Sequence, residues 1–211
     1  MNLFTELHLL NLFIGLLPIA FVIVFKLNSS KQYKYLFIFL LSNFFFSCIS
    51  YIPYKLLFGL EDNLFVYFFR SLANIFIAYK IFHPASQLYK KVTIALMAVI
   101  PISLIIYGDN ISTFIISTCI EAAYIIFLSF QYLIKLHKTY TGDSLRKEPM
   151  VWFSLSFMFE YLVKFIFHSF SNELLLYSIN LLRLLGNFFL PITEIFATIL
   201  ITIGFYFARK K

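Results

Sequence analysis

The sequence predicts an all-α polytopic membrane protein: a single domain over residues 1–211, built as a bundle of seven transmembrane helices. Three observations lead to this prediction. Of the 211 residues, 61% are hydrophobic and 13% are charged, whereas a soluble domain carries about 25% charged residues. The mean hydropathy is +0.87. The apolar residues fall into long runs separated by short polar segments. Lys and Arg are concentrated in every second one of these segments.

This composition excludes a soluble enzyme and a nucleic-acid-binding domain, because so few polar residues cannot cover a soluble globule. The basic balance, 17 Lys and Arg against 10 Asp and Glu, is therefore interpreted as membrane topology. The two cysteines, Cys48 and Cys119, lie inside apolar runs, where a thiol behaves as a small hydrophobic group. No disulfide framework is expected.

A helix needs about 20 apolar residues to cross the hydrocarbon layer, which is about 30 Å thick. Transmembrane strands would show alternating polarity within a closed barrel, and the runs found here are apolar on all sides. We therefore expect a helix in each run. The runs are Leu9–Phe25, Tyr35–Phe58, Leu64–Phe82, Val92–Tyr107, Ile111–Ile134, Val151–Phe170 and Leu174–Ala208.

The first and last runs differ from the other five. No Lys or Arg precedes the first run and no small-residue cleavage site follows it, so we expect a retained span rather than a cleaved signal peptide. The last run would be about 52 Å long as a helix, at 1.5 Å per residue. We therefore expect its transmembrane helix to cover Ile179–Ala208, with a kink at Pro191.

The charges of the connecting segments indicate the orientation. The first, third and fifth segments and the C-terminus carry thirteen cations, counting residues near helix ends whose side chains can reach the membrane surface. The N-terminus and the other segments carry no Lys or Arg and hold acids instead. Because cytoplasmic loops are enriched in Lys and Arg, we expect the N-terminus outside and the C-terminus in the cytoplasm, in a bacterial cytoplasmic membrane. The cations are Lys26, Lys31, Lys34, Lys80, Lys90, Lys91, Lys135, Lys138, Arg146, Lys147, Arg209, Lys210 and Lys211. The acids are Glu6, Glu61, Asp62, Asp109 and Glu173.

Seven ionisable residues lie inside the expected spans. A charge within the bilayer is costly unless it is paired or hydrated, so each is a candidate functional residue. On the sixth run, Trp152, Ser156, Glu160, Lys164 and His168 recur at every fourth position and share one helix face. The seven residues are Lys55, Arg70, Glu121, Glu160, Lys164, Arg183 and Glu194.

Three interpretations of these residues stay open. The first is structural: Glu160 pairs with Lys164, and Arg70 pairs with Glu121 or Glu194. The second is a pocket open to the outside, in which Arg70, Lys164 and Arg183 accept an anionic or zwitterionic ligand. The third is a proton or ion pathway through the three intramembrane glutamates.

The sequence lacks the motifs of retinal proteins, haem proteins and the common enzyme classes. The last run holds no Lys before Lys210, which excludes a retinal Schiff base, and the histidines do not face one another as bis-His haem would require. An outer metal or haem site from His8 and His168 is a minor alternative. No H-E-x-x-H, G-x-S-x-G or P-loop pattern occurs, so an enzyme is not expected, and no cofactor or metal is expected. Paired broken helices, which would point to a transport site, are not found.

The last third of the chain resembles a group of small bacterial seven-helix membrane proteins of unknown function, some of which are encoded beside sensor histidine kinases. Glu148–Pro149 precedes Met150–Phe153 and a Phe/Tyr-rich helix, and the last helix carries Asn180, Asn187 and Gly204–Phe205. The resemblance implies a seven-helix fold and a signalling partner, and it transfers no site residues. Glu160 and Lys164 depart from the smaller or polar residues expected in the group.

We therefore predict a sensory or receptor-like module that binds a small anionic or lipidic ligand from the outer side. It would signal to a sensor histidine kinase or another membrane protein through Lys135–Met150 and the C-terminus. The alternatives are a small transporter or channel subunit and an accessory structural subunit. The bilayer is the expected surrounding, and nucleic acid is not an expected partner. The candidate ligand-binding or ion-pair residues are Arg70, Glu121, Glu160, Lys164, His168, Arg183 and Glu194.

Overall fold

The computed structural model describes residues 3–27, 30–50, 64–82, 87–107, 111–140 and 142–209. Over these ranges the regular structure is helical, with no strand, which confirms the all-α class. Four helices of the described ranges are long and apolar enough to cross a membrane, which indicates an integral membrane protein. They cover Lys31–Ile49, Phe114–Thr139, Pro149–Ser169 and Ile179–Arg209, and a shorter apolar helix covers Leu9–Val24.

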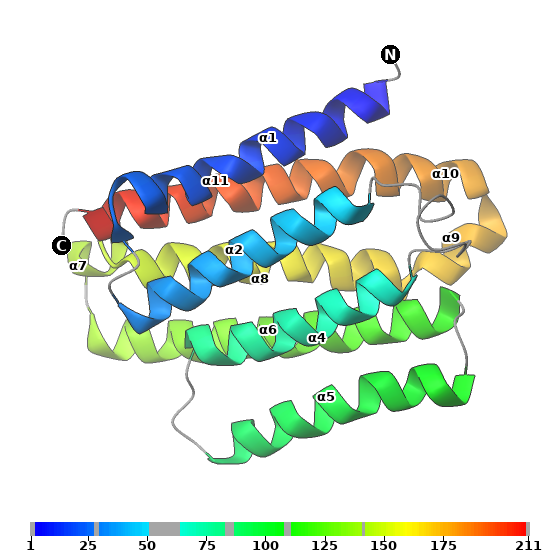
Figure 1. Ribbon diagram of the computed structural model, residues 1–211, viewed down its shortest axis with the longest axis horizontal. Helices are drawn as coiled ribbons and strands as arrows, with labels where there is room; N and C mark the ends of the chain where they lie inside the picture. Colours follow the sequence, from blue (N-terminus) through cyan, green and yellow to red (C-terminus); the bar gives the residue numbers. More distant parts are fainter. Residues whose placement is uncertain are drawn as a thin grey trace.

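Each expected apolar run contains a long helix, and the helices lie side by side along the molecule (Figure 1). Successive long helices run in opposite directions. The first six long helices are α1 (Leu3–Val24), α2 (Lys31–Ser50), α4 (Leu64–Phe82), α5 (Gln87–Tyr107), α6 (Ile111–Thr139) and α8 (Pro149–Ser169). The last one consists of α10 (Ile179–Leu184), η2 (Leu185–Phe189) and α11 (Leu190–Arg209), and the short helices are α7 (Asp143–Arg146) and α9 (Ser171–Tyr177).

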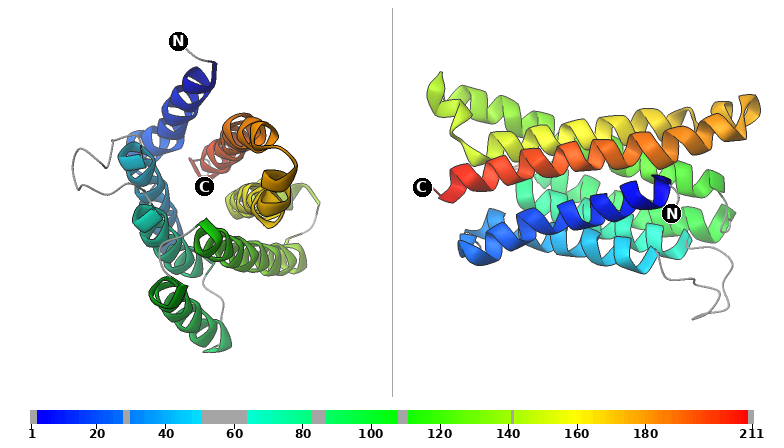
Figure 2. Two further views of the ribbon diagram at one scale, coloured as in Figure 1. Left: turned by 90° about the vertical axis from the view of Figure 1, so that its right-hand side faces the viewer. Right: turned by 90° about the horizontal axis from the view of Figure 1, so that it is seen from above.

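Six of the long helices form a closed ring. Contacts follow the order α1, α2, α4, α6, α8 and α11, and α11 packs back against α1. The end-on view in Figure 2 shows this ring, with α5 outside it against α4 and α6. The ring gives the protein an interior that six different helices share.

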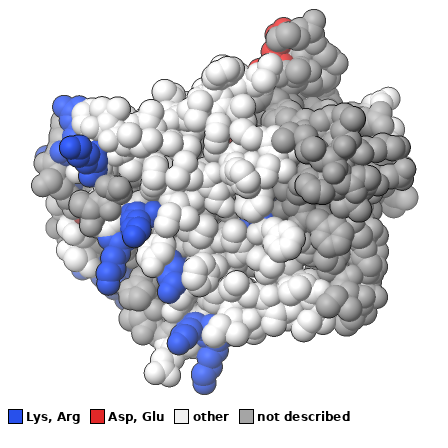
Figure 3. Space-filling view, viewed as in Figure 1, with Lys and Arg blue, Asp and Glu red and all other residues white. Residues whose placement is uncertain are grey.

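The surface of the bundle suits lipid along its sides and water at one end. Large apolar side chains such as Phe13, Phe69, Ile94 and Phe130 are exposed. The described surface Lys and Arg side chains gather at the end of the bundle where the C-terminus lies (Figure 3). The alternation of cations along the sequence thus becomes a single basic end, because consecutive helices are antiparallel.

Aromatic side chains fill the ring near this basic end. Phe153 and Phe157 of α8 and Phe205 of α11 are almost completely buried, and the ring centroids of Phe153 and Phe205 lie 4.9 Å apart. Gly204 allows this close packing, since a Cβ atom there would overlap the Phe153 ring. An aromatic core therefore fills the basic half of the ring.

The connection before α8 is shorter than the sequence predicts. The charges indicate a loop over Lys135–Met150, but α6 continues to Thr139, α7 covers Asp143–Arg146 and α8 begins at Pro149. Hydropathy marks where a helix leaves the hydrocarbon layer, whereas the backbone hydrogen bonds continue as long as the residues favour a helix. Lys135 and Lys138 therefore lie on the last turns of α6.

The last helix changes its winding before Pro191. Residues Leu185–Phe189 form a π-helical turn between α10 and α11. A proline lacks the N–H group, and its ring clashes with the carbonyl four residues earlier. That carbonyl belongs to Asn187, so the wider π turn accommodates Pro191 where the sequence predicts a kink. Turns of this kind are rare in proteins, and those that occur are frequently found at functional sites.

Candidate functional site

A cavity of about 470 Å³ lies inside the ring. All six ring helices line it, and its residues belong to the half of the bundle away from the basic end. Its apolar wall includes Leu12, Phe39, Phe44 and Tyr161. Its polar wall consists of Asn11 of α1, Asn43 of α2, Arg70, Ser71 and Asn74 of α4, Glu121 of α6, Glu160, Lys164 and His168 of α8, and Glu194 of α11.

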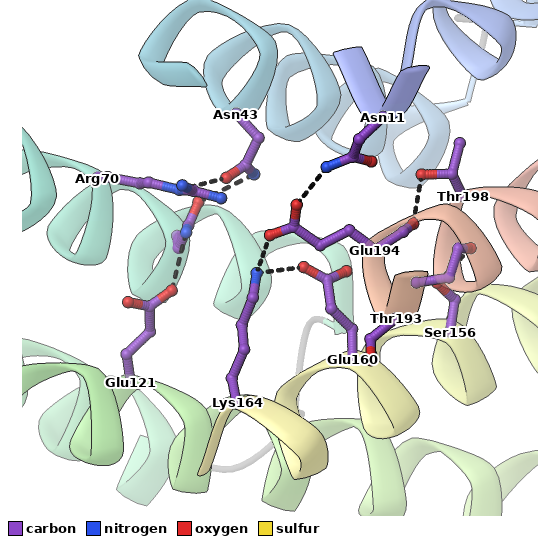
Figure 4. Close-up of polar contacts among 12 residues, drawn as sticks. Asn11, Asn43, Arg70, Glu121, Ser156, Glu160, Lys164, Thr193, Glu194 and Thr198 are labelled. Carbon is purple, nitrogen blue, oxygen red and sulfur yellow. Dashed lines mark hydrogen bonds and ion pairs between the residues drawn. The ribbon is translucent and has the colours of Figure 1, made fainter. Parts of the chain in front are cut away.

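Lys164 is the centre of an ion-pair cluster (Figure 4). Its ammonium nitrogen lies 2.5 Å from Oε1 of Glu160 and 3.1 Å from Oε1 of Glu194. The intrahelical pair allowed by the four-residue spacing is therefore present, and an interhelical pair joins it. Asn11 donates a hydrogen bond of 2.5 Å to the second oxygen of Glu194, which brings α1 into the cluster.

Glu121 is held by neutral donors. Its two carboxylate oxygens accept hydrogen bonds from Ser71, at 2.5 Å, and from the Asn74 amide, at 2.8 Å. All three side chains are buried. Ser71 and Asn74 belong to α4, so these bonds fix the contact between α4 and α6.

Arg70 continues this network through amides. Its Nε atom donates a hydrogen bond of 2.9 Å to Oδ1 of Asn43. The Asn43 amide in turn donates to Oδ1 of Asn74, at 3.2 Å, and Asn74 donates to Glu121. The sequence predicts a carboxylate beside Arg70, whereas the contact that the structure provides is an amide, and Glu121 is reached through two amide groups.

The arginine side chain nevertheless points into the cavity (Figure 4). Within the described part of the chain, its hydrogen bond to Asn43 uses Nε, and neither Nη group has a partner. A guanidinium group carries five N–H donors. Four donors of Arg70 are therefore available to a molecule in the cavity.

The residues that recur at every fourth position of α8, from Trp152 to His168, form a polar stripe, and its two halves have different surroundings. Glu160, Lys164 and His168 line the cavity. Ser156 is buried against α11 and donates a hydrogen bond of 2.8 Å to the Ala197 carbonyl. Trp152 donates from its indole nitrogen to the Arg146 carbonyl at 2.8 Å. The stripe therefore begins at the basic end, passes through the interface between α8 and α11, and opens into the cavity.

His168 has an aromatic surrounding rather than a ligand set. Its ring lies edge-on to Phe114 of α6, with centroids 5.5 Å apart, and edge-on to Phe167. Among the described residues, no group of three or more His, Cys, Asp or Glu side chains could hold a metal ion.

Two of the predicted residues cannot be placed in the cavity wall. Arg183 belongs to α10, and its side chain is not among those that the structure describes. Lys55 lies outside the described residues, within 51–63. The other predicted residues, Arg70, Glu121, Glu160, Lys164, His168 and Glu194, line one cavity.

Sequence reasoning missed the neutral part of the site. Asn11, Asn43, Ser71 and Asn74 carry most of its hydrogen bonds, yet reasoning restricted to charges passes over them. The sequence does mark these residues, because a polar side chain within an apolar transmembrane run commonly hydrogen bonds to another helix. Asn74 also follows Arg70 by four residues, which places both side chains on one face of α4.

Chemically, the site combines paired charges with hydrogen-bond donors that face the cavity. A buried guanidinium with free donors binds carboxylate or phosphate groups through paired hydrogen bonds. Comparison of the chain with protein-family models, with curated proteins and with solved structures finds no match.

Proposed function

We propose that the protein is a receptor-like membrane module that binds a small solute carrying an anionic group inside the helix ring. The observation that supports this proposal most directly is Arg70, which faces the cavity with both Nη groups free of partners in the described chain. An intramembrane charge with free donors is expensive to keep without a ligand or water. The cavity volume lies within the range of about 300–1,000 Å³ that is common for ligand sites.

The proposal includes a membrane topology. Seven spans, with the N-terminus outside and the C-terminus in the cytoplasm of a bacterium, would place the basic end inside, as the distribution of loop cations favours. The cavity lies in the opposite half of the bundle, so a ligand would enter from the outer side. This topology is supported by the basic end and by the number of long helices in the described chain.

A signal would leave through the last helix. Glu194 of α11 takes part in the charge cluster, and α11 runs from the cavity to the basic end, where it reaches Arg209. A ligand that competes for the charges of Lys164 or Glu160 would change the contact between α8 and α11. A cytoplasmic or membrane partner, such as a sensor histidine kinase, would contact α7 and the end of α11 and respond to this change.

One observation favours transport as a second candidate function. The π turn and Pro191 interrupt the last helix beside the cavity, since Gly186, Leu190 and Pro191 all line it. Interrupted helices at mid-membrane are typical of transport sites. The two functions differ in outcome, because a receptor binds its ligand without moving it across the bilayer.

The experiment uses the purified full chain in lipid nanodiscs with a panel of probes: acetate, 4-aminobutyrate and inorganic phosphate. We expect at least one probe to raise the melting temperature of the wild type, and Arg70→Gln to abolish that rise. Lys138→Gln, which removes an exposed cation on the last turn of α6, is the matched control and should keep it. An equal response of wild type and Arg70→Gln, or no response to any probe, would overturn the proposed site.

Proteoliposomes then separate the two candidate functions. Uptake of the radiolabelled probe by liposomes that contain the wild type, and not by those that contain Arg70→Gln, would establish transport. Binding without uptake supports the receptor.

A further inference from the structure

Among the described residues, the hydrogen bonds in the cavity leave one carboxylate oxygen without a partner. Glu121 has both oxygens occupied, by Ser71 and Asn74, and Glu194 has both occupied, by Asn11 and Lys164. Glu160 uses only Oε1, toward Lys164. Among the described residues its Oε2 has no partner, and Glu160 lines the cavity. Among the described charged side chains of the wall, the Nη donors of Arg70 and Oε2 of Glu160 are therefore without a partner.

These two groups come from different sides of the ring. Arg70 belongs to α4 and Glu160 to α8, and α6 lies between these helices in the order of contacts. In Figure 4, Arg70 enters from the left and Glu160 from the lower right, and the Lys164 ammonium and the Glu194 carboxylate are drawn between their ends. A ligand that reaches both must extend across the cavity and carry unlike groups at its two ends.

The charge balance favours the same conclusion. The described lining contains two cations, Arg70 and Lys164, against the three carboxylates of Glu121, Glu160 and Glu194. A simple anion would add negative charge to a wall that already has more carboxylates than cations. A zwitterion adds no net charge and supplies a cation to the carboxylate that has a free oxygen. Uncompensated charge is costly in a low-dielectric interior.

We propose that the cavity binds a small zwitterion, with its anionic group on the Arg70 guanidinium and its ammonium group on Oε2 of Glu160. This inference rests on the proposed function and specifies its ligand class. Glu160 thereby becomes the specificity-determining residue, since Arg70 alone accepts any anion of suitable size.

The experiment measures dissociation constants in nanodiscs for three matched series of probes. The first series consists of unbranched ω-amino acids from glycine to 6-aminohexanoate. The second consists of the same carboxylates without the amino group, and the third of the same amines without the carboxylate. We expect at least one amino acid to bind at least tenfold more tightly than either of its partners in the other series.

Two variants test which residue binds each end of the ligand. Glu160→Gln keeps the shape and the Oε1 acceptor but loses the charge, so it should remove the preference for the amino acid. The affinity for the carboxylate should stay equal or rise, because one repelling charge is gone from the wall. Arg70→Gln should abolish binding of both. Glu173→Gln, an exposed acid on α9, is the matched control and should keep the wild-type preference.

The outcomes separate this inference from the proposed function. Carboxylates or inorganic phosphate that bind as tightly as the amino acids would overturn the zwitterion and leave the anion site standing. A preference that persists in Glu160→Gln would overturn the role of Glu160. Amines that bind without any carboxylate binding, or no binding in any series, would overturn both the inference and the proposed function.

Discussion

The ammonium group of Lys164 on α8 lies 3.1 Å from a carboxylate oxygen of Glu194 on α11, and 2.5 Å from Glu160 on its own helix. One cation therefore pairs with two acids and joins two helices inside the ring. All three side chains are largely shielded, with relative exposures between 12% and 28%. The arrangement makes the stability of the α8–α11 interface depend on a residue that also lines the cavity.

Lys164→Ala should lower the stability of the protein strongly. The change leaves Glu160 and Glu194 without their cation, and removing one partner of a buried pair costs about 3–5 kcal/mol. The measurement is thermal unfolding in detergent, with Lys138→Ala as the control for an exposed lysine. Probe binding measured on the same preparation then shows whether Lys164 also serves the ligand. An unchanged melting temperature would mean that water, rather than Lys164, compensates the two acids.

Asn74→Leu should destabilise the protein by about 1–3 kcal/mol, the cost of leaving a buried polar group unpaired. Asn74 is 1% exposed and is the donor to one oxygen of Glu121 and the acceptor for Asn43. Because Asn43 in turn holds Arg70, the affinity for anionic probes should fall as well. Asn180→Leu, at an exposed position of α10, is the control and should change neither quantity. Normal stability of Asn74→Leu would show that the amide relay is not required.

Gly204→Ala should destabilise the basic half of the bundle. The new methyl group would overlap the ring of Phe153, which is completely buried and has no room to turn aside. Overpacking of this kind costs about 1–3 kcal/mol. Gly15→Ala is the control, because apart from the adjacent residues and the local helix backbone no described atom lies within 4 Å of the place that its new methyl group would occupy. It should leave the melting temperature unchanged or slightly raised. Equal effects of the two substitutions would contradict the close packing of α8 against α11.

Ser156→Ala should cost far less than Lys164→Ala, although both remove a contact between α8 and α11. The Ser156 hydroxyl donates to the Ala197 carbonyl, and a hydrogen bond between transmembrane helices contributes about 0.6 kcal/mol on average. Alanine also leaves no polar group behind on α8. Unfolding of the two variants under identical conditions provides the comparison. A loss as large as that of Lys164→Ala would show that the hydroxyl, rather than the charge cluster, holds the interface.

Cysteine labelling tests the proposed orientation. In a variant without Cys48 and Cys119, a cysteine at the exposed position of Glu173 on α9 should react with an impermeant thiol reagent added to intact cells. A cysteine at the exposed position of Asp143 on α7 should react only after the cells are opened. A cysteine within Glu61–Asn63, outside the described residues, should behave like the one at Glu173. The reverse pattern would invert the topology and place the cavity in the cytoplasmic half.

The spacing of residues was enough to predict one part of the site. Glu160 and Lys164 are separated by four residues on one helix, so their pairing follows from helix geometry alone. The same geometry placed His168 beside them, and all three line the cavity. The partners of Arg70 could not be predicted in this way, because they lie on another helix.

The sequence by itself determined where the helices lie and which of their ends is basic. Both properties are local, since a helix in lipid must be apolar along its length and cations must remain at its ends. Only the tertiary structure decided which side chains meet: that Arg70 is held by Asn43, that Glu121 is held by Ser71 and Asn74, and that α5 stays outside the ring. The physical reason is that most faces of these helices are equally apolar. When every face of a helix is apolar, periodicity does not show which face is inside, and the rotation and depth of each helix are decided by packing.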